Sequence, residues 1–152
     1  MFKKILVANR GEIAVRIIRA CKELNIKTVA IHSNVDSEAM HVKLADESIC
    51  VGRALPNESY LNIPSIISAI SITGADAVHP GYGFLSENDK FAEILSSHKV
   101  KFIGPSSKSI LELGNKSNAL KLASKFKLPI LGSKNMKNIS NNNEAKKIAD
   151  EI

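Results

Sequence analysis

KILVANRGEIAVRIIRACKEL, residues 4–24, changes its hydrophobic pattern from that of a strand to that of a helix within one short turn. Residues 4–8 form a continuous apolar run of strand length, whereas residues 12–24 space their apolar side chains at helical intervals. The apolar face that this spacing predicts consists of Ile13, Ile17, Ala20, Cys21 and Leu24. The stretch therefore predicts a strand, a glycine turn and an amphipathic helix.

Strand and helix patterns continue to alternate as far as residue 103. Strand patterns lie at residues 28–32, 48–51, 75–78 and 100–103, and helix patterns lie at residues 64–72 and 88–97. Residues 28–32, TVAIH, lack the alternation of a half-exposed strand, so both of their faces should be covered. This order predicts a doubly wound α/β domain, an open and mostly parallel sheet of about four to five strands with helices on both faces.

The pattern changes after Pro105. Residues 109–113 and 118–126 have helical spacing with a break at Gly114, and we expect this part to lead to a further domain. Residues 135–143 are rich in asparagine, which indicates a surface loop, and residues 144–152 have the pattern of an amphipathic helix. Because that helix would end with the chain and leave its apolar face uncovered, we expect the chain to be cut from a longer one.

Length and composition are those of a soluble domain. The chain has 152 residues, of which 44% are hydrophobic and 24% charged. Its first apolar run is too short for a signal peptide or a membrane span, so we expect a cytoplasmic protein that makes no membrane contact. Cys21 and Cys50 belong to no CxxC pair, and we interpret both as buried free thiols.

The net charge of +6 does not indicate nucleic-acid binding. Residues 1–89 carry nine Lys or Arg against ten Asp or Glu, and residues 90–152 carry twelve Lys against five Asp or Glu. The excess lysines are dispersed along the second half, with almost no aromatic residues between them. That distribution is typical of solvated helix faces, and we expect no nucleic-acid partner.

Ligands of a doubly wound sheet bind beyond the carboxyl ends of its strands, so the loops that follow the strands are the candidate sites. The first loop, residues 9–12, contains a single glycine, Gly11, whereas a dinucleotide site needs G-x-G-x-x-G. NAD binding therefore has little support. The free amides of the following helix could hold an anion, or Gly11 could simply form the turn while Glu12 suits the positive end of the helix.

The loop at residues 79–88, HPGYGFLSEN, is the most distinctive segment of the chain. Two glycines flank Tyr82 and allow backbone amides to face a ligand, while Ser86 with Asp89 resembles a helix capping box. A binding loop and an ordinary glycine-rich loop are equally good interpretations of these residues. His79 has no partner at metal-ligand spacing, so we expect a structural histidine and no metal site.

Three further residues carry charge at positions that matter. Lys116 follows the break at Gly114 and Asn115, where it could reach an anionic nucleotide or could be one more solvated lysine. Arg19 and Glu23 lie four residues apart on the outer face of the first helix, which by itself predicts only a weak exposed ion pair.

Three segments, ILVANRGEIA at residues 5–14, HPGYGFLSEN at residues 79–88 and FIGP at residues 102–105, resemble biotin carboxylase in order and in register. Residues 16–24, 44–47, 59–62 and 72–75 are similar to the same family, so the resemblance covers essentially the whole chain. Two departures are Asn115, where the family usually has Asp, and Leu131, where it usually has Pro.

The resemblance implies a Rossmann-like domain that precedes an ATP-grasp domain. On this basis residues 1–113 are the N-terminal domain of a biotin carboxylase, and residues 114–152 are a linker and the start of the ATP-grasp region. The family uses MgATP and bicarbonate to form carboxyphosphate, whose carboxyl group passes to biotin on a carrier protein or domain. A carboxyltransferase and a second copy of the chain are the further partners implied.

The same resemblance gives roles to five residues. Lys116 is implied as an ATP contact, Tyr82 and Gly83 as part of the biotin and bicarbonate end of the cleft, and Arg19 and Glu23 as dimer-interface residues. The family's catalytic base, magnesium ligands and ATP lid lie beyond residue 152, so we expect no catalytic residue in this chain.

The parent enzyme that the resemblance favours is an acetyl-CoA carboxylase, whose malonyl-CoA product serves fatty acid synthesis. Two alternatives remain open. One is the front domain of a pyruvate or propionyl-CoA carboxylase, and the other is a stand-alone binding module without catalytic activity.

Overall fold

The structure, a computed structural model, describes residues 1–130, 142–143 and 146. Contacts divide the chain into two compact units, residues 1–110 and residues 111–152, and each is considered by itself. The loop expected at residues 135–143 and the helix expected at residues 144–152 lie outside the described residues, apart from 142–143 and 146. The expected domain boundary after residue 113 stays a prediction.

Unit 1 alternates strands and helices as the sequence predicts. The strands are β1 (Lys4–Val7), β2 (Lys27–Ser33), β3 (Glu47–Gly52), β4 (Ala77–His79) and β5 (Lys101–Phe102). The helices are α1 (Gly11–Glu23), α2 (Met40–Leu44), α3 (Ile63–Thr73) and α4 (Asp89–Ser97), with short 3₁₀ turns η1 (Asn34–Asp36) and η2 (Pro56–Glu58). The five strands are all parallel in the order β3-β2-β1-β4-β5, which confirms the doubly wound α/β fold.

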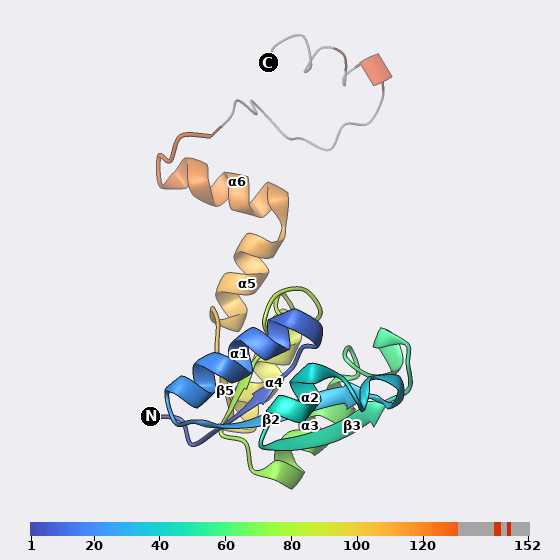
Figure 1. Ribbon diagram of the computed structural model, residues 1–152. Coiled ribbons are helices and arrows are strands. Elements are labelled where there is room, and N and C mark those ends of the chain that lie inside the picture. The colour runs from blue at the N-terminus through green and yellow to red at the C-terminus, as the bar shows by residue number, and fades with distance from the viewer. Residues whose placement is uncertain (131–141, 144–145, 147–152) are drawn as a thin grey trace. The chain divides into compact units, whose positions relative to one another are not determined.

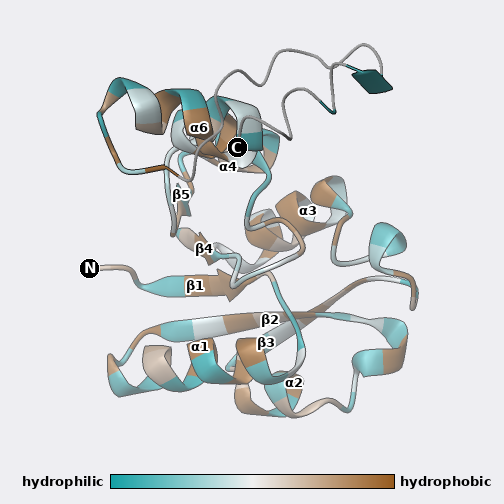
Figure 2. Cartoon of the chain, turned by 90° about the horizontal axis from the view of Figure 1, so that it is seen from above, coloured by the Kyte–Doolittle hydropathy of each residue, from teal (hydrophilic) through white to brown (hydrophobic). Residues whose placement is uncertain are grey.

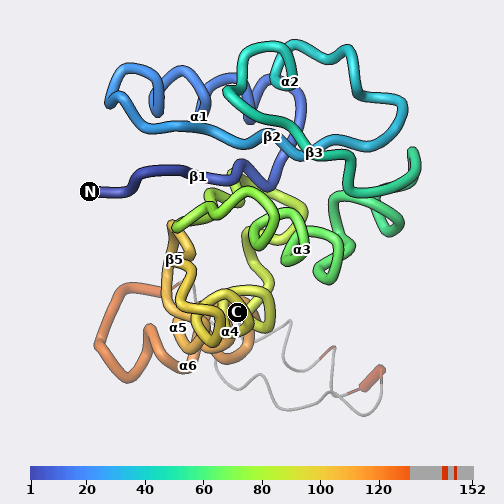
Figure 3. Tube along the Cα trace, turned by 90° about the horizontal axis from the view of Figure 1, so that it is seen from below, coloured from blue at the N-terminus to red at the C-terminus, as the bar shows by residue number. Residues whose placement is uncertain are grey.

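The central strand β1 is buried on both faces and divides the core into two layers. Ile5 and Val7 point to the face covered by α1, whereas Leu6 and Ala8 point to the face covered by α3 and α4. Figures 2 and 3 show α1 and α2 on one side of β1 and β2, with α3 on the other side. Because successive strand residues point to opposite faces, a strand covered on both sides must be apolar throughout, as residues 5–8 are.

The structure corrects the predicted apolar face of α1. Ile17 and Cys21 are buried, but Ala20 and Leu24 are exposed, while Ala14 and Ile18 take the buried positions instead. Leu24 lies outside the core because α1 ends at Glu23 and the chain turns there towards β2. The buried stripe is therefore rotated relative to the one that the spacing predicts.

Two other predictions are also wrong. Cys50 is exposed rather than buried, because β3 is an edge strand whose Val51 packs into the core, so the preceding side chain points to the opposite, less covered face. Helix α4 is capped by Asn88, whose side-chain oxygen accepts a hydrogen bond from the Phe91 amide at 2.8 Å, and not by Ser86. Cys21 is a buried free thiol as expected, and its burial raises its pKa.

Asp46 fastens the start of β3 to the start of β2. Its carboxylate accepts hydrogen bonds from the Lys27 ammonium at 2.9 Å, the Thr28 amide at 2.9 Å and the Thr28 hydroxyl at 3.0 Å. The Lys27 hydrogen bond, together with those from Thr28, lowers the pKa of Asp46 to about 2 despite partial burial. The ionised form therefore stabilises the pairing of β2 with β3.

In unit 2, a capped helix begins next to Lys116. Helix α5 (Ser107–Gly114) ends there, and α6 (Lys116–Lys125) begins after Asn115. The Asn115 side-chain oxygen accepts hydrogen bonds from the amides of Ser117 at 3.0 Å and Asn118 at 3.2 Å. The break predicted at Gly114 is thus confirmed as a junction between two helices.

We predict that Asp46→Asn lowers the free energy of unfolding at pH 7 by about 1–2 kcal/mol, since it weakens charge-assisted hydrogen bonds at the β2–β3 junction. The folded-state pKa lies below the usual value of 3.8, so this stabilisation is present at neutral pH and is lost as the pH falls from about 4 towards 2. Urea unfolding of wild type and variant, followed by circular dichroism across that range, measures the difference. It should shrink as the pH falls.

Glu38→Gln is the matched control, because the Glu38 side chain is 85% exposed and its ion pair with Lys43 lies on the surface. Its effect at pH 7 should stay within about 0.5 kcal/mol. Equal effects of the two substitutions would contradict the role given to Asp46.

Candidate functional site

The strand order places the loops after β1 and β4 at a topological switch point. From β1 the chain passes through α1 to β2 on one side, and it later returns through α3 to β4 on the other side of β1. The crevice between two such strands, beyond their carboxyl ends, is where open α/β sheets bind ligands. Residues 9–12 and 79–88 follow these two strands, so the prediction that they share one edge of the sheet is confirmed (Figure 1).

Asn9 ties the two loops together. Its side chain is buried, and the amide nitrogen donates to the carbonyl oxygens of Pro80 at 2.7 Å and Tyr82 at 2.9 Å. The amide oxygen accepts from the Arg10 backbone amide at 2.9 Å. The sequence shows Asn9 within the loop but gives no signal for this role, which depends on strand pairing between distant segments.

The glycine at position 81 is required by close packing. Its φ is +65°, and a Cβ there would lie 2.7 Å from Asn9 Nδ2 and 2.8 Å from Ile13 Cγ2. Its amide donates to Nδ1 of His79 at 3.0 Å, so the proton of the neutral ring lies on Nε2. Burial lowers the pKa of His79, which keeps the ring neutral and fits the structural role expected of it.

Tyr82 and Gly83 form the exposed crest of the 79–88 loop. The Tyr82 side chain is 67% exposed, and its hydroxyl donates to Oε1 of Glu12 at 3.1 Å, which raises the pKa of Tyr82. Gly83 has a φ of +69° and no atom close to where a Cβ would lie. Beside Tyr82 runs an open groove of about 600 Å³, whose apolar lining includes Ile13, Ile17 and Ile103.

A second cluster behind the loop was not predicted from the sequence. We call it the Arg10 cluster: Arg10, Ser33, Asp36, Tyr60 and Phe84. Its members come from four separate parts of unit 1, and no sequence spacing connects them. Only the fold shows that they meet.

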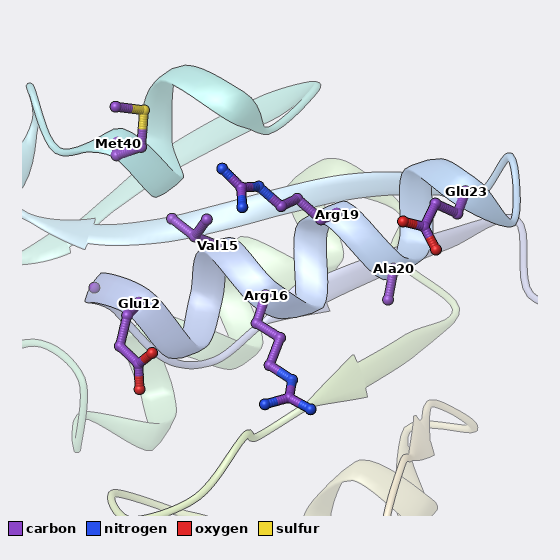
Figure 4. A pocket seen from close by; sticks show the side chains of 8 residues that line it. Glu12, Val15, Arg16, Arg19, Ala20, Glu23 and Met40 are labelled. Atoms are coloured by element: carbon purple, nitrogen blue, oxygen red, sulfur yellow. The ribbon is translucent and has the colours of Figure 1, made fainter.

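Arg19 and Glu23 lie on the outer face of α1, as predicted. They line an open pocket of about 680 Å³ together with Val15, Arg16 and Met40, and Figure 4 shows Arg19 and Arg16 extending from different sides of the helix. Among the residues that the structure describes, Arg19 and Glu23 form no ion pair with each other. Both charges are therefore available to a partner surface.

Lys116 lies in unit 2, at the first position of α6, and its side chain is exposed. A lysine at this end of the helix is unfavourable to the macrodipole by about 0.3–1 kcal/mol, so helix stability does not explain why Lys116 stands there.

Among the described residues, none of the helices has the length and apolar character of a membrane span.

Comparison with known proteins gives a consistent result. The family described as "Biotin carboxylase, N-terminal domain" matches residues 1–110. Biotin carboxylase 1 of Bacillus subtilis is 50% identical over 153 residues, covering 100% of this chain and 34% of the relative. The human mitochondrial propionyl-CoA carboxylase alpha chain is 58% identical over 124 residues, covering 82% of this chain and 17% of the relative.

A solved structure has the same fold. The biotin carboxylase domain of the Hydrogenobacter thermophilus 2-oxoglutarate carboxylase, described as a dimer in complex with MgADP, ADP and bicarbonate, matches with a TM-score of 0.90 and 47% identity. The match covers 100% of this chain and 33% of that one. The chain thus spans about a third or less of the proteins it resembles. With a family match over residues 1–110 and loops paired at the switch point, the chain belongs to the biotin carboxylase N-terminal domain family.

Proposed function

We propose that the chain is the front domain of an ATP-dependent biotin carboxylase, which carboxylates carrier-bound biotin with bicarbonate. The observation that carries the proposal is the pairing of the two loops by Asn9, which leaves Tyr82 and Gly83 exposed at the switch point of a domain of this family. We assign these two residues to the end of the cleft that receives biotin and bicarbonate. The complex of the Hydrogenobacter domain with MgADP and bicarbonate supports the choice of ligands.

Magnesium would neutralise charge on the phosphates and on the group being transferred. The described residues contain no group of three His, Cys, Asp or Glu side chains that could hold a metal ion. As the resemblance to biotin carboxylase implies, we expect the magnesium ligands and the catalytic residues to lie in the remainder of the carboxylase. What this chain contributes is the positioning of Tyr82 and Gly83 by its first unit and one cation for the nucleotide from its second.

We assign that cation to Lys116. The exposed ammonium attracts phosphate, and the positive end of the α6 macrodipole attracts it at the same end of the helix. Asn115 preserves this geometry, since an amide oxygen caps a helix about as well as a carboxylate oxygen does. Replacing the family's usual Asp with Asn also removes a negative charge beside Lys116.

For the parent enzyme we propose an acetyl-CoA carboxylase that supplies malonyl-CoA for fatty acid synthesis in the cytoplasm. A biotin carrier protein and a carboxyltransferase would be its partners. A propionyl-CoA carboxylase is the second candidate, because relatives of that kind are as similar to this chain as the biotin carboxylases are.

We further propose that Arg19 and Glu23 contact a second copy of the carboxylase. The Hydrogenobacter domain is described as a dimer, and the pocket beside Arg19 contains an exposed apolar side chain, Met40. Exposed apolar area flanked by both signs of charge is suited to an interface between identical subunits.

We predict that the chain alone does not hydrolyse ATP with bicarbonate and free biotin. A chimera in which it replaces the matching 34% of Bacillus subtilis biotin carboxylase 1 should regain biotin-dependent ATP hydrolysis. A coupled assay for ADP release measures both. Turnover by the chain alone would show that the catalytic groups lie within this chain, against our assignment. A folded but inactive chimera would favour a binding module.

Lys116→Gln in this chimera should raise the KM for ATP about tenfold or more, because a charge-assisted contact is worth about 1.5–3 kcal/mol. Lys121→Gln, at another exposed lysine of α6, should leave the KM almost unchanged. Initial rates over a range of ATP concentrations measure both. Similar KM values for the two variants would remove the nucleotide role from Lys116.

Met40→Lys should weaken dimerisation of the chimera roughly tenfold or more, since it removes an apolar contact and adds positive charge near Arg19. The matched control is Ile72→Lys, at an exposed apolar position on α3. Sedimentation velocity at several concentrations measures the dimer dissociation constant. An unchanged constant for Met40→Lys would exclude this face of α1 from the interface.

A further inference from the structure

The 79–88 loop has an unfavourable backbone conformation at Phe84. Its φ is +42°, in the left-handed region that side chains other than glycine seldom adopt, and it follows Gly81 and Gly83 with φ values of +65° and +69°. A segment with this sequence of dihedral angles needs contacts from outside to keep it in one shape.

The Phe84 ring is one of three groups in mutual contact, with the Tyr60 ring and the Arg10 guanidinium. It lies against the Tyr60 ring with centroids 5.3 Å apart and an interplanar angle of 22°. The Arg10 guanidinium lies 5.4 Å from the Tyr60 centroid and 5.7 Å from the Phe84 centroid, so its charge contacts both rings. Arg10 thereby connects the loop after β1 to the loop after β4 through side chains.

Tyr60 fixes this group of three side chains to the end of β2. Tyr60 is fully buried, and its hydroxyl donates to Oδ2 of Asp36 at 2.6 Å while accepting from the Ser33 amide at 3.1 Å. The Ser33 hydroxyl donates to the same carboxylate oxygen at 2.7 Å. Asp36 also lies 3.7 Å from the Arg10 guanidinium, which holds the cation over the rings.

The pKa shifts in the Arg10 cluster agree with its geometry. Burial and the hydrogen bond to Asp36 raise the pKa of Tyr60 to about 12, so the phenol stays neutral and keeps donating. The Tyr60 hydrogen bond leads the contacts that lower the pKa of Asp36, so the carboxylate stays charged opposite Arg10. Near neutral pH the Tyr60 phenol is therefore neutral and the Asp36 carboxylate is charged.

We propose that Arg10 is a positioning residue that holds Tyr82 and Gly83 in place for the carboxylation reaction. Asn9 binds the carbonyls of residues 80 and 82 on one side, and Arg10 holds Phe84 on the other, so Tyr82 and Gly83 are fixed from both directions. The inference rests on the proposed function for its kinetic consequence, although the ordering of the loop does not depend on it. A lysine could pair with Asp36, but its compact ammonium would lack the planar, delocalised charge with which Arg10 contacts both rings.

Hydrogen exchange of the 152-residue chain tests the ordering of the loop directly. The reporters are the amides of Ser86 and Asn88, which donate to the carbonyls of Gly83 and Leu85 within the loop. We expect Arg10→Gln to speed their exchange roughly threefold or more, with Arg10→Lys recovering only part of the protection. The exposed Arg53→Gln is the matched control and should change nothing.

The amides of β1 report on global stability, and they should exchange at wild-type rates in all variants. A uniform loss of protection in β1 and the loop would assign Arg10 a general structural role and overturn the proposal. Unchanged loop protection in Arg10→Gln would also overturn it, since the buried Leu85 would then suffice to hold the loop. Phe84→Leu, which removes the ring but leaves Arg10 beside Asp36, gives the same test should Arg10→Gln not fold.

Kinetics of the chimera separate the two proposals. Arg10→Gln should lower kcat/KM for biotin roughly threefold or more and leave the KM for ATP unchanged, because the loop is assigned to the biotin end of the cleft. Faster loop exchange together with unchanged biotin kinetics would uphold the positioning by Arg10 and refute the role proposed for Tyr82 and Gly83. Unchanged loop exchange would refute the positioning, whatever the kinetics.

Discussion

The side-chain amide of Asn9 joins the loops that follow β1 and β4 through its nitrogen and braces its own loop through its oxygen. Its nitrogen donates to two carbonyls of the 79–88 loop, and its oxygen accepts from the next backbone amide. The group is only 3% exposed, so each lost partner would leave a buried polar atom unpaired, at about 1–3 kcal/mol. An aspartate lacks the donors and a leucine lacks both, which makes the amide specific to this position. The close approach of Gly81 to Asn9 and the hydrogen bond between Tyr82 and Glu12 both depend on the distance at which Asn9 holds the two loops.

The fold class could be predicted because local patterns and burial agree in this sequence. Continuous apolar strands, helices of regular spacing and short connections leave few arrangements other than a parallel sheet covered on both faces. The strand order could not be read in the same way, because neither the edge position of β3 nor the place of β1 between β2 and β4 has a local signal. The error at Cys50 has this origin, since its exposure follows from the edge strand rather than from its neighbours in sequence.

The same distinction between local patterns and long-range pairing applies to the candidate site. The 79–88 loop stood out because its glycines and tyrosine are contiguous, and the break before Lys116 is marked by Gly114. The Arg10 cluster combines residues 10, 33, 36, 60 and 84, which meet only when β1, β2 and β4 pair. The cap of α4 shows the limit at short range, because Ser86 and Asn88 are both good capping residues and only the backbone bend selects Asn88.

The contacts of Tyr82 restrict what it can offer a ligand. Its hydroxyl has one proton, which is donated to Glu12, so while that bond persists only the ring and the oxygen lone pairs are free. The adjoining groove is apolar along Ile13, Ile17 and Ile103, and its two charged lining residues, Glu12 and Arg16, have opposite signs. Such surroundings favour an uncharged ring system over bicarbonate. Under the proposed function we therefore expect Tyr82 to contact the bicyclic ring of biotin rather than bicarbonate.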